Sequence, residues 1–152
     1  MGQRHVRRGQ VAEEFDGVDL GDPRRIRRAK SIASRLAFRP DASLPGAMRE
    51  DAMLEGAYRL LSNEHVSLEQ LIQPHVQRTA ARVRALGKAY AIHDTTRFTF
   101  GGEMRREGLG TVAGANDQGF RAHVTLAVSA DGRREPLGGL AIGTRLRPPK
   151  KE

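Results

Sequence analysis

The sequence predicts an α+β protein in which a helical segment, residues 1–87, precedes a set of antiparallel strands in residues 88–152. Two observations lead to this prediction. Up to Leu86 the apolar residues recur at spacings of three and four, as in amphipathic helices. After Gly87, itself a typical helix terminator, the spacing changes to two, as in half-buried strands. We therefore place a domain boundary between residues 87 and 88.

The first strong helix signal begins at Asp22. Asp is a favoured N-cap because its carboxylate accepts hydrogen bonds from the free amides of the first turn, and Pro23 suits the next position. The apolar residues that follow recur at helical spacing, namely Ile26, Ala29, Ala33 and Leu36. We expect this helix to end near Phe38 and a shorter helix to precede it around residues 10–15.

Two further helical regions are predicted before the change of spacing. The first is a single helix over residues 46–61. The second starts at Ser67, which forms a capping box with Gln70. Pro74 leaves two alternatives for this region: it kinks a single helix, or it begins a new helix after a short turn.

Three strands are predicted after Gly87, over residues 90–100, 120–129 and 137–146. Asp131-Gly132 is a strong turn signal and predicts a hairpin between the last two strands. The stretch between the first two strands is rich in Gly and polar residues, so we expect a mobile loop over residues 101–119.

The chain carries 26 Lys and Arg against 18 Asp and Glu, a formal net charge of +8 over 152 residues. This excess favours a polyanionic partner, with nucleic acid as the leading candidate, because basic side chains bind phosphates and release condensed counterions. The absence of Cys excludes disulfides and thiolate zinc sites. No stretch approaches the roughly 20 apolar residues of a membrane span, so we expect a soluble protein of the cytoplasm.

A basic run coincides with the predicted helix over residues 23–38. It has seven basic side chains and no acidic one: Arg24, Arg25, Arg27, Arg28, Lys30, Arg35 and Arg39. We interpret it as a DNA-facing surface, and the alternative is a basic, solvated helix without a partner. Four of these side chains crowd into the first turns, where the helix dipole disfavours cations, and a bound phosphate would relieve that cost.

Other positions also fit a nucleic-acid partner. Gly56 lies inside a predicted helix, where Gly costs about 1 kcal/mol relative to Ala. Its presence indicates close approach by another helix or by a DNA backbone. Beside the Gly-rich loop, Arg105, Arg106 and Arg121 are placed to meet a backbone.

Asp94 lies at the centre of the strand AYAIHDTTRFTF, residues 89–100. Strand interiors are depleted in Asp, so a metal ligand is one interpretation. The alternative is a local turn in which Asp94 bonds to Thr95 or Thr96. His93 adjoins Asp94, but adjacent strand residues face opposite sides of a sheet and would not share a metal ion.

Four segments, taken in order, resemble the N-terminal portion of bacterial cut-and-paste DDE transposases of the Tn-five type, members of the insertion-sequence-four-like family. They are LGDPRR at residues 20–25, MLEGAYRLLSN at 53–63, AIHDTT at 91–96 and QGFRAHVTLAV at 118–128. The resemblance extends over about residues 20–148, and it covers only the first third of such an enzyme.

The resemblance implies a fold and a set of site residues. Residues 88–152 would form the first three antiparallel strands of a truncated ribonuclease-H-like catalytic domain. Asp94 would be the first of three catalytic carboxylates, which together hold Mg²⁺ or Mn²⁺ for attack on a phosphodiester. The contacts of the helical domain with transposon-end DNA carry over to Arg24, Arg25, Arg28 and Arg59.

The other two catalytic carboxylates of that family have no convincing counterpart in this sequence, since Asp131 lies at a hairpin turn and Glu135 just after it. We therefore interpret the chain as a fragment of a transposase that binds the double-stranded DNA of transposon ends without catalysis alone. Two alternatives stay open: an active enzyme when a second chain supplies the missing carboxylates, and a truncated inhibitor of full-length transposase. The expected location is the nucleoid of a bacterial cytoplasm.

Overall fold

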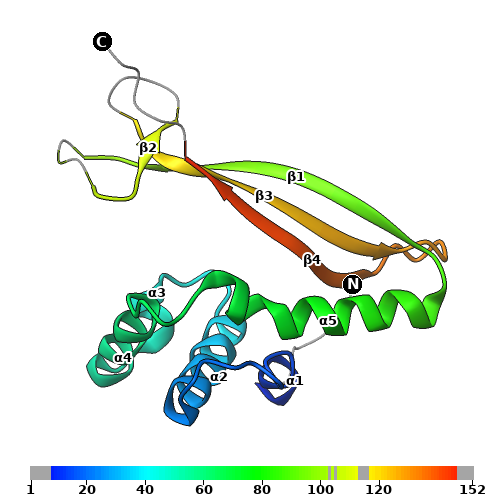
Figure 1. Ribbon diagram of the computed structural model, residues 1–152, viewed down its shortest axis with the longest axis horizontal. Helices are drawn as coiled ribbons and strands as arrows, with labels where there is room; N and C mark the ends of the chain where they lie inside the picture. The colour runs from blue at the N-terminus through cyan, green and yellow to red at the C-terminus, as the bar shows by residue number, and fades with distance from the viewer. Residues whose placement is uncertain (1–7, 103, 105, 113–116, 147–152) are drawn as a thin grey trace. The chain divides into compact units, whose positions relative to one another are not determined.

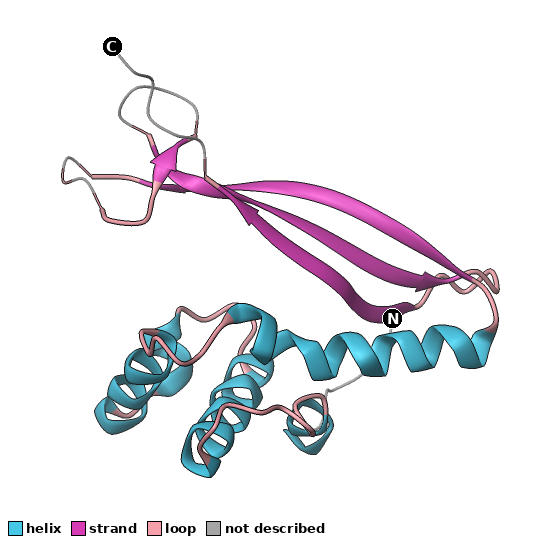
Figure 2. Cartoon of the chain, in the orientation of Figure 1, coloured by secondary structure: helices cyan, strands magenta, loops and turns pink. Residues whose placement is uncertain are grey.

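The computed structural model describes residues 8–102, 104, 106–112 and 117–146. The chain divides into two compact units, Met1–Arg78 and Thr79–Glu152 (Figures 1 and 2). The helices are α1 (Arg8–Glu13), α2 (Pro23–Phe38), α3 (Leu44–Met48), α4 (Asp51–Leu61) and α5 (Leu68–Leu86). The strands are β1 (Ala89–Phe100), β2 (Gly110–Thr111), β3 (Gln118–Ser129) and β4 (Pro136–Arg145). Helices therefore precede an antiparallel sheet, which confirms the predicted α+β class.

α2 is the central helix of the first unit, because α1, α3 and α4 all pack against it (Figure 1). It begins as predicted: the Oδ1 atom of its N-cap, Asp22, accepts a hydrogen bond from the amide of Arg24 at 2.7 Å. Pro23 is the first helical residue and Phe38 the last. Both predicted ends of this helix are confirmed.

The single helix predicted over residues 46–61 is wrong, because the structure has two helices there. α3 begins after Ser43, whose hydroxyl oxygen accepts a hydrogen bond from the amide of Gly46 at 3.3 Å. Arg49 then takes a φ of +65° and ends α3, so that α4 starts anew at Asp51. The apolar pattern continues across this break, and the pattern alone therefore predicts one helix.

Both ends of α5 form as predicted. At its start the amide of Ser67 donates to Gln70 Oε1 at 2.8 Å, and the amide of Gln70 donates to Ser67 Oγ at 3.1 Å, which is the capping box. At its end Gly87 takes a φ of +74° and donates its amide to the carbonyl of Val83 at 3.0 Å. Pro74 lies inside one continuous helix, which selects the single-helix alternative.

A buried apolar cluster holds the first unit together. Its members come from the segment before α2 and from α2, α3 and α4: Val18, Leu20, Ala29, Ile32, Ala47, Met48, Ala57 and Leu60. Leu20 and Met48 are the largest apolar side chains among them that are fully enclosed. Because burial of apolar surface is the main stabilising contribution, this cluster fixes α2 against α3 and α4.

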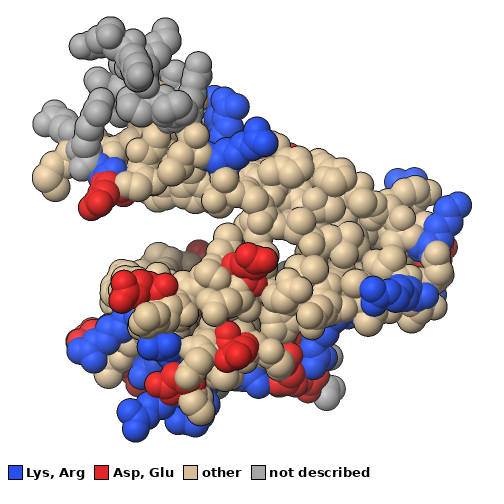
Figure 3. Space-filling view, in the orientation of Figure 1, with Lys and Arg blue, Asp and Glu red and all other residues tan. Residues whose placement is uncertain are grey.

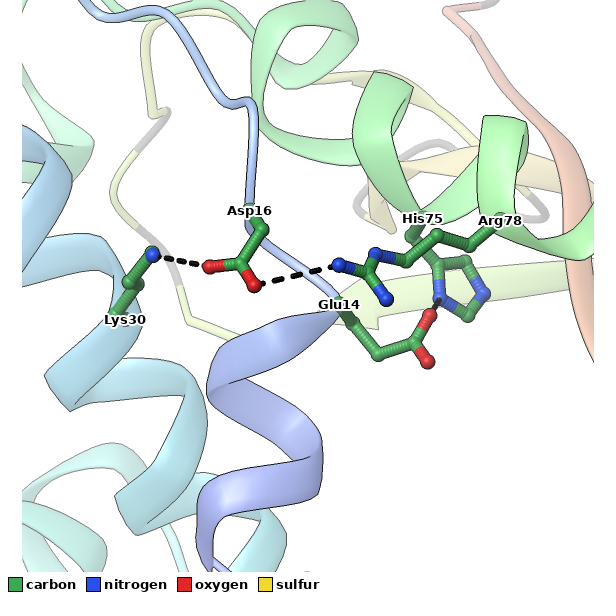
Figure 4. A network of polar contacts seen from close by, with 5 residues as sticks. All are labelled: Glu14, Asp16, Lys30, His75 and Arg78. Atoms are coloured by element: carbon green, nitrogen blue, oxygen red, sulfur yellow. Dashed lines mark hydrogen bonds and ion pairs between the residues drawn. The ribbon is translucent and has the colours of Figure 1, made fainter.

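Ion pairs tie the segment after α1 to α2 and α5 (Figure 4). The carboxylate of Asp16 contacts Lys30 Nζ at 2.5 Å and Arg78 Nη2 at 3.3 Å. Next to it, Glu14 Oε2 lies 2.8 Å from His75 Nδ1. The hydrogen bond from Lys30, with the positive charges of Lys30 and Arg78, lowers the pKa of Asp16 below its ordinary value.

The second unit is built on three long antiparallel strands with β3 in the middle (Figure 2). β1 pairs with β3 along its whole length, from Ala89 opposite Ser129 to Phe100 opposite Gln118. β4 pairs with the other edge of β3, with two irregularities of register. The two-residue strand β2, which the sequence did not predict, also pairs with β3 and lies within the predicted Gly-rich loop.

The predicted hairpin between β3 and β4 is confirmed. Asp131 organises the turn, because its Oδ1 atom accepts hydrogen bonds from Ser129 Oγ at 2.8 Å and from the amide of Arg133 at 3.2 Å. Gly132 takes a φ of +85°, which favours glycine. Asp131 therefore has a structural role in the turn.

The division between the two units falls inside α5, whereas the change of spacing in the sequence lies after Gly87. The end of α5 belongs to the second unit, where Arg82 Nη1 donates to the carbonyl of Leu137 in β4 at 3.0 Å. Thr79, the first residue of that unit, is fully buried. The domain boundary between residues 87 and 88 stays a prediction.

Candidate DNA-binding surface and the strand of Asp94

The arginines of α2 that we expect to contact DNA stand in its first two turns. Arg24 is exposed, whereas Arg25 and Arg28 are half-buried. Positive side chains at a helix N-terminus are opposed by the helix dipole, so their position is unfavourable without an anionic neighbour. Among the described residues, Arg24 has no side-chain hydrogen bond or ion pair, and its guanidinium is available to a phosphate.

The basic run of α2 is not one uniform surface. Five of its side chains have partners within the protein: Arg25 the carbonyl of Leu20, Arg28 the sulfur of Met53, Lys30 the carboxylate of Asp16, Arg35 the carbonyl of Met48, and Arg39 the carbonyl of Gly46. Arg24 and Arg27 are exposed and have no such partner in the described part of the chain. Fewer side chains of the basic run are therefore free of partners within the protein than the sequence suggested.

Arg28 packs closely against α4. Its Nη1 atom lies 3.8 Å from the sulfur of Met53, and a β-carbon built on Gly56 would come within 2.1 Å of the same Nη1 atom. Gly56 therefore permits close approach, as the sequence indicated, and the approaching group is a side chain of α2. This packing holds the guanidinium of Arg28 in one place beside α4.

Arg25 lines a shallow hollow at the start of α2. Its Nη1 atom donates to the carbonyl of Leu20 at 3.1 Å, which folds the side chain back toward the loop. The hollow is also lined by residues of the connection between α4 and α5 and of α5 itself, namely Glu64, His65 and Gln70. Arg25 therefore lies at a place where three segments of the first unit meet.

Arg59 is on α4, one helical turn after Gly56. Its side chain is 77% exposed, and its Nη2 atom lies 2.5 Å from Glu55 Oε1 in a pair four residues apart. Exposed pairs of this kind are weak, so a phosphate can replace the carboxylate at small cost. Gly56, against which Arg28 packs, lies three residues before Arg59 in the same helix.

Asp94 lies in the uninterrupted strand β1 and is exposed. Its Oδ2 atom accepts a hydrogen bond from Thr96 Oγ1 at 2.9 Å, so the predicted local bond exists, but it forms within a strand and the predicted turn is wrong. Directly opposite stand Val124 of β3 and then Ile142 of β4. Asp94 is thus a carboxylate on an apolar and partly exposed sheet face.

The donor set around Asp94 does not make a Mg²⁺ or Mn²⁺ site by itself. No group of three or more His, Asp or Glu side chains is placed to hold a metal ion among residues 8–102, 104, 106–112 and 117–146. One carboxylate and the hydroxyl of Thr96 fall short of the octahedral oxygen set that Mg²⁺ takes. His93 faces the other side of the sheet, as expected, where its ring stacks on that of His123.

Residues 7–66 match a protein-family model described as transposase DNA-binding. The matched part of the chain contains α1 to α4 and all four arginines discussed above. The match supports an N-terminal DNA-binding domain of a transposase in this part of the chain, with DNA as its partner.

Within the part of the chain that the structure describes, no helix is long and apolar enough to cross a membrane.

Of the three arginines predicted near the Gly-rich loop, Arg105 lies outside the described residues. The side chain of Arg106 packs on a nearby ring of β1: its guanidinium carbon lies 5.6 Å from the centre of the Phe100 ring. Arg121 is exposed near the start of β3, the middle strand of the sheet, and the sequence did not indicate which residues would lie beside it.

Proposed function

We propose that this protein binds transposon-end DNA as the N-terminal part of a Tn-five-like cut-and-paste DDE transposase of the insertion-sequence-four-like family. The observation that carries the proposal is the transposase DNA-binding match over residues 7–66. The motifs LGDPRR and AIHDTT support the particular family, and the second lies in β1, beyond the matched residues.

The DNA contact is made by Arg24, Arg25, Arg28 and Arg59. Phosphates at the start of α2 meet both the positive end of the helix dipole and the arginine side chains, so they bind where cations alone are costly. Arg28 is held against Gly56 before DNA arrives, which lowers the entropy lost on binding. Arg24 is exposed, as is Arg59, and both can turn toward the backbone of the duplex.

The second unit is proposed to be the opening part of a ribonuclease-H-like domain. Support comes from its three long antiparallel strands, with Asp94 in the middle of the first of them. Tyr90, Ile92 and Phe98 share the face of Asp94 and are 55%, 50% and 44% exposed. Such an apolar face suits the packing of further elements against the sheet.

Asp94 is proposed to act as one metal-binding carboxylate of the transposase, with Mg²⁺ or Mn²⁺ as the cofactor. The described residues around it do not complete a site, so the remaining ligands would come from another segment or another chain. When bound, the metal would supply charge stabilisation at the phosphodiester. We expect this chain alone, with Mg²⁺ and duplex DNA, neither to nick nor to join DNA.

The proposal is tested by selection from a library of random-sequence duplexes with the full chain. We expect one sequence to be enriched, and binding to weaken steeply with salt. Arg24→Ala with Arg59→Ala should reduce the slope of log K against log salt by about 0.9 for each phosphate that is no longer neutralised. The matched control is Arg84→Ala with Arg134→Ala, which removes the same charge from exposed positions of the second unit. Equal slopes in the two variants, or no enriched sequence, would contradict the proposal.

A further inference from the structure

Three arginines stand in one row across the sheet. The register places Arg97 of β1 directly opposite Arg121 of β3, and Arg121 directly opposite Arg145 of β4. Directly opposite residues of antiparallel strands project their side chains from the same face of the sheet. The arginine row, made of Arg97, Arg121 and Arg145, is therefore a product of strand pairing between distant parts of the sequence.

The fold does not compensate the charges of the arginine row. All three residues are exposed, and none of them has a hydrogen bond or ion pair from its side chain to another described residue. Like charges in directly opposite positions destabilise a sheet. Figure 3 shows basic side chains gathered at the end of the sheet where β4 ends. An anionic partner would turn this unfavourable arrangement into a favourable one.

The surface next to the arginine row is polar. Along the same face, Thr95 Oγ1 lies 2.7 Å from His123 Nδ1, and Thr125 Oγ1 lies 3.0 Å from His93 Nδ1. The two imidazole rings stack with their centres 5.6 Å apart. Thr125 is buried, whereas His93, Thr95 and His123 are exposed. Hydroxyl and imidazole groups form hydrogen bonds with phosphate oxygens, so these three side chains extend the same kind of surface away from the arginines.

The surface is also open on the side of β4. Gly143 stands opposite His123 in the register, two residues before Arg145. A β-carbon built on Gly143 would meet no atom of the described residues within 4 Å, so none of them covers the sheet at this position. An extended ligand can therefore lie against the backbone of β4 and reach the arginine row.

We propose that the arginine row is a second DNA contact, which binds the phosphate backbone of a duplex without reading its sequence. Adjacent strands are about 4.8 Å apart, so the outer arginines start about 9.6 Å apart. This span corresponds to an advance of about three nucleotide steps along the duplex axis, at about 3.4 Å rise each, so the row can reach several phosphates of one DNA strand. The forked guanidinium suits phosphate oxygens, and backbone contacts carry no base information. The choice of DNA as the polyanion rests on the proposed function.

The test is the salt dependence of binding of the full chain to a random-sequence duplex. The row variant is Arg97→Gln, Arg121→Gln and Arg145→Gln. The matched control is Arg84→Gln, Lys88→Gln and Arg134→Gln, which removes the same charge from exposed positions of the same unit. We expect the slope of log K against log salt to fall by about 2 to 3 in the row variant and by less than about 1 in the control, because each neutralised phosphate accounts for about 0.9 of the slope.

Two further measurements decide the inference. Arginine-to-lysine changes at the same three positions keep the charge and should keep the slope. Thermal unfolding of the row variant at low salt should show an equal or higher Tm, because repulsion is removed. A lower Tm would show that the arginines serve the fold, and equal slopes in the row variant and the control would show that they do not contact DNA; each result overturns the inference.

Failure of this inference is distinguishable from failure of the proposed function. The same salt series is measured for the full chain with Arg24→Gln and Arg59→Gln. If this variant loses slope and the row variant behaves like its control, only the inference falls. If the row variant alone loses slope, the inference stands and the proposed helical surface falls. If the unchanged chain binds no duplex, both fall.

Discussion

The guanidinium of Arg28 lies over Gly56, in the space that a β-carbon would occupy. A β-carbon at that position would be 2.1 Å from Nη1 and 2.5 Å from Cζ of Arg28. Arg28 of α2 thus packs its side chain on α4, and both helices lie in the region of the chain that matches a transposase DNA-binding domain. This contact packs α2 against α4 and fixes the direction of the Arg28 side chain.

Gly56→Ala should move Arg28 without unfolding the domain. The displaced group is the end of a flexible side chain, and Ala gains about 1 kcal/mol of helix propensity over Gly, so we expect the stability to change by less than about 1 kcal/mol. DNA affinity should fall as far as in Arg28→Ala, and the double variant should fall no further. Fluorescence anisotropy with a selected duplex and urea unfolding measure both quantities. If the losses of affinity in Gly56→Ala and Arg28→Ala added up in the double variant, the packing of Arg28 on Gly56 and the DNA contact of Arg28 would be unrelated.

Gly119→Ala should destabilise the sheet strongly, whereas Gly143→Ala should not. A β-carbon on Gly119 would lie 1.9 Å from the carbonyl oxygen of Phe98, a backbone atom that cannot turn away. Overpacking of this kind costs about 1–3 kcal/mol or more. At Gly143 a β-carbon would have no atom of the described part of the chain within 4 Å, and Ala is less costly than Gly in a strand. Thermal unfolding of both variants checks the contrast, and equal Tm values would mean that β1 and β3 are not so closely paired.

The sequence predicted those features that depend on near neighbours. The Asp22 cap and the capping box of Ser67 with Gln70 are set by residues two or three positions apart, and the structure has both. The break at Arg49 was missed, because a positive φ at an ordinary residue has no compositional signal. The arginine row was also missed, because only the strand register brings Arg97, Arg121 and Arg145 together.

Asp16→Asn should remove a pH-dependent part of the stability. The hydrogen bond from Lys30 lowers the pKa of Asp16 below its ordinary 3.8, so the folded state favours the carboxylate. A lowered folded pKa gives stability that is present above 3.8 and is lost as the pH falls through the folded value. Urea unfolding of both proteins should therefore differ at neutral pH and converge in acid. A difference that persists in acid would point to altered packing instead of the missing charge.

A polypeptide of residues 1–87 should fold by itself as a helical domain. All buried members of its apolar cluster lie between Val18 and Leu60, and Gly87 completes the end of α5. We expect a helical circular dichroism spectrum and cooperative thermal unfolding. The comparison is a polypeptide of residues 1–78, which stops at the division between the two compact units and should lose helix from the cut end of α5. A random-coil spectrum for residues 1–87 would contradict the predicted domain boundary.

Asp94→Val should stabilise the sheet while leaving DNA binding unchanged. Strand positions favour Val over Asp by up to about 1 kcal/mol, and the new side chain would lie opposite Val124 on the apolar face. Thr96→Val is the matched control, because it removes the hydrogen bond of 2.9 Å to Asp94 and keeps the carboxylate. A gain in stability with unchanged DNA binding is the result expected from the proposed metal-binding role, since active sites commonly trade stability for function. If Asp94→Val instead lowers the Tm below that of Thr96→Val, Asp94 serves the fold, and the proposal that it is a metal-binding carboxylate loses its physical basis.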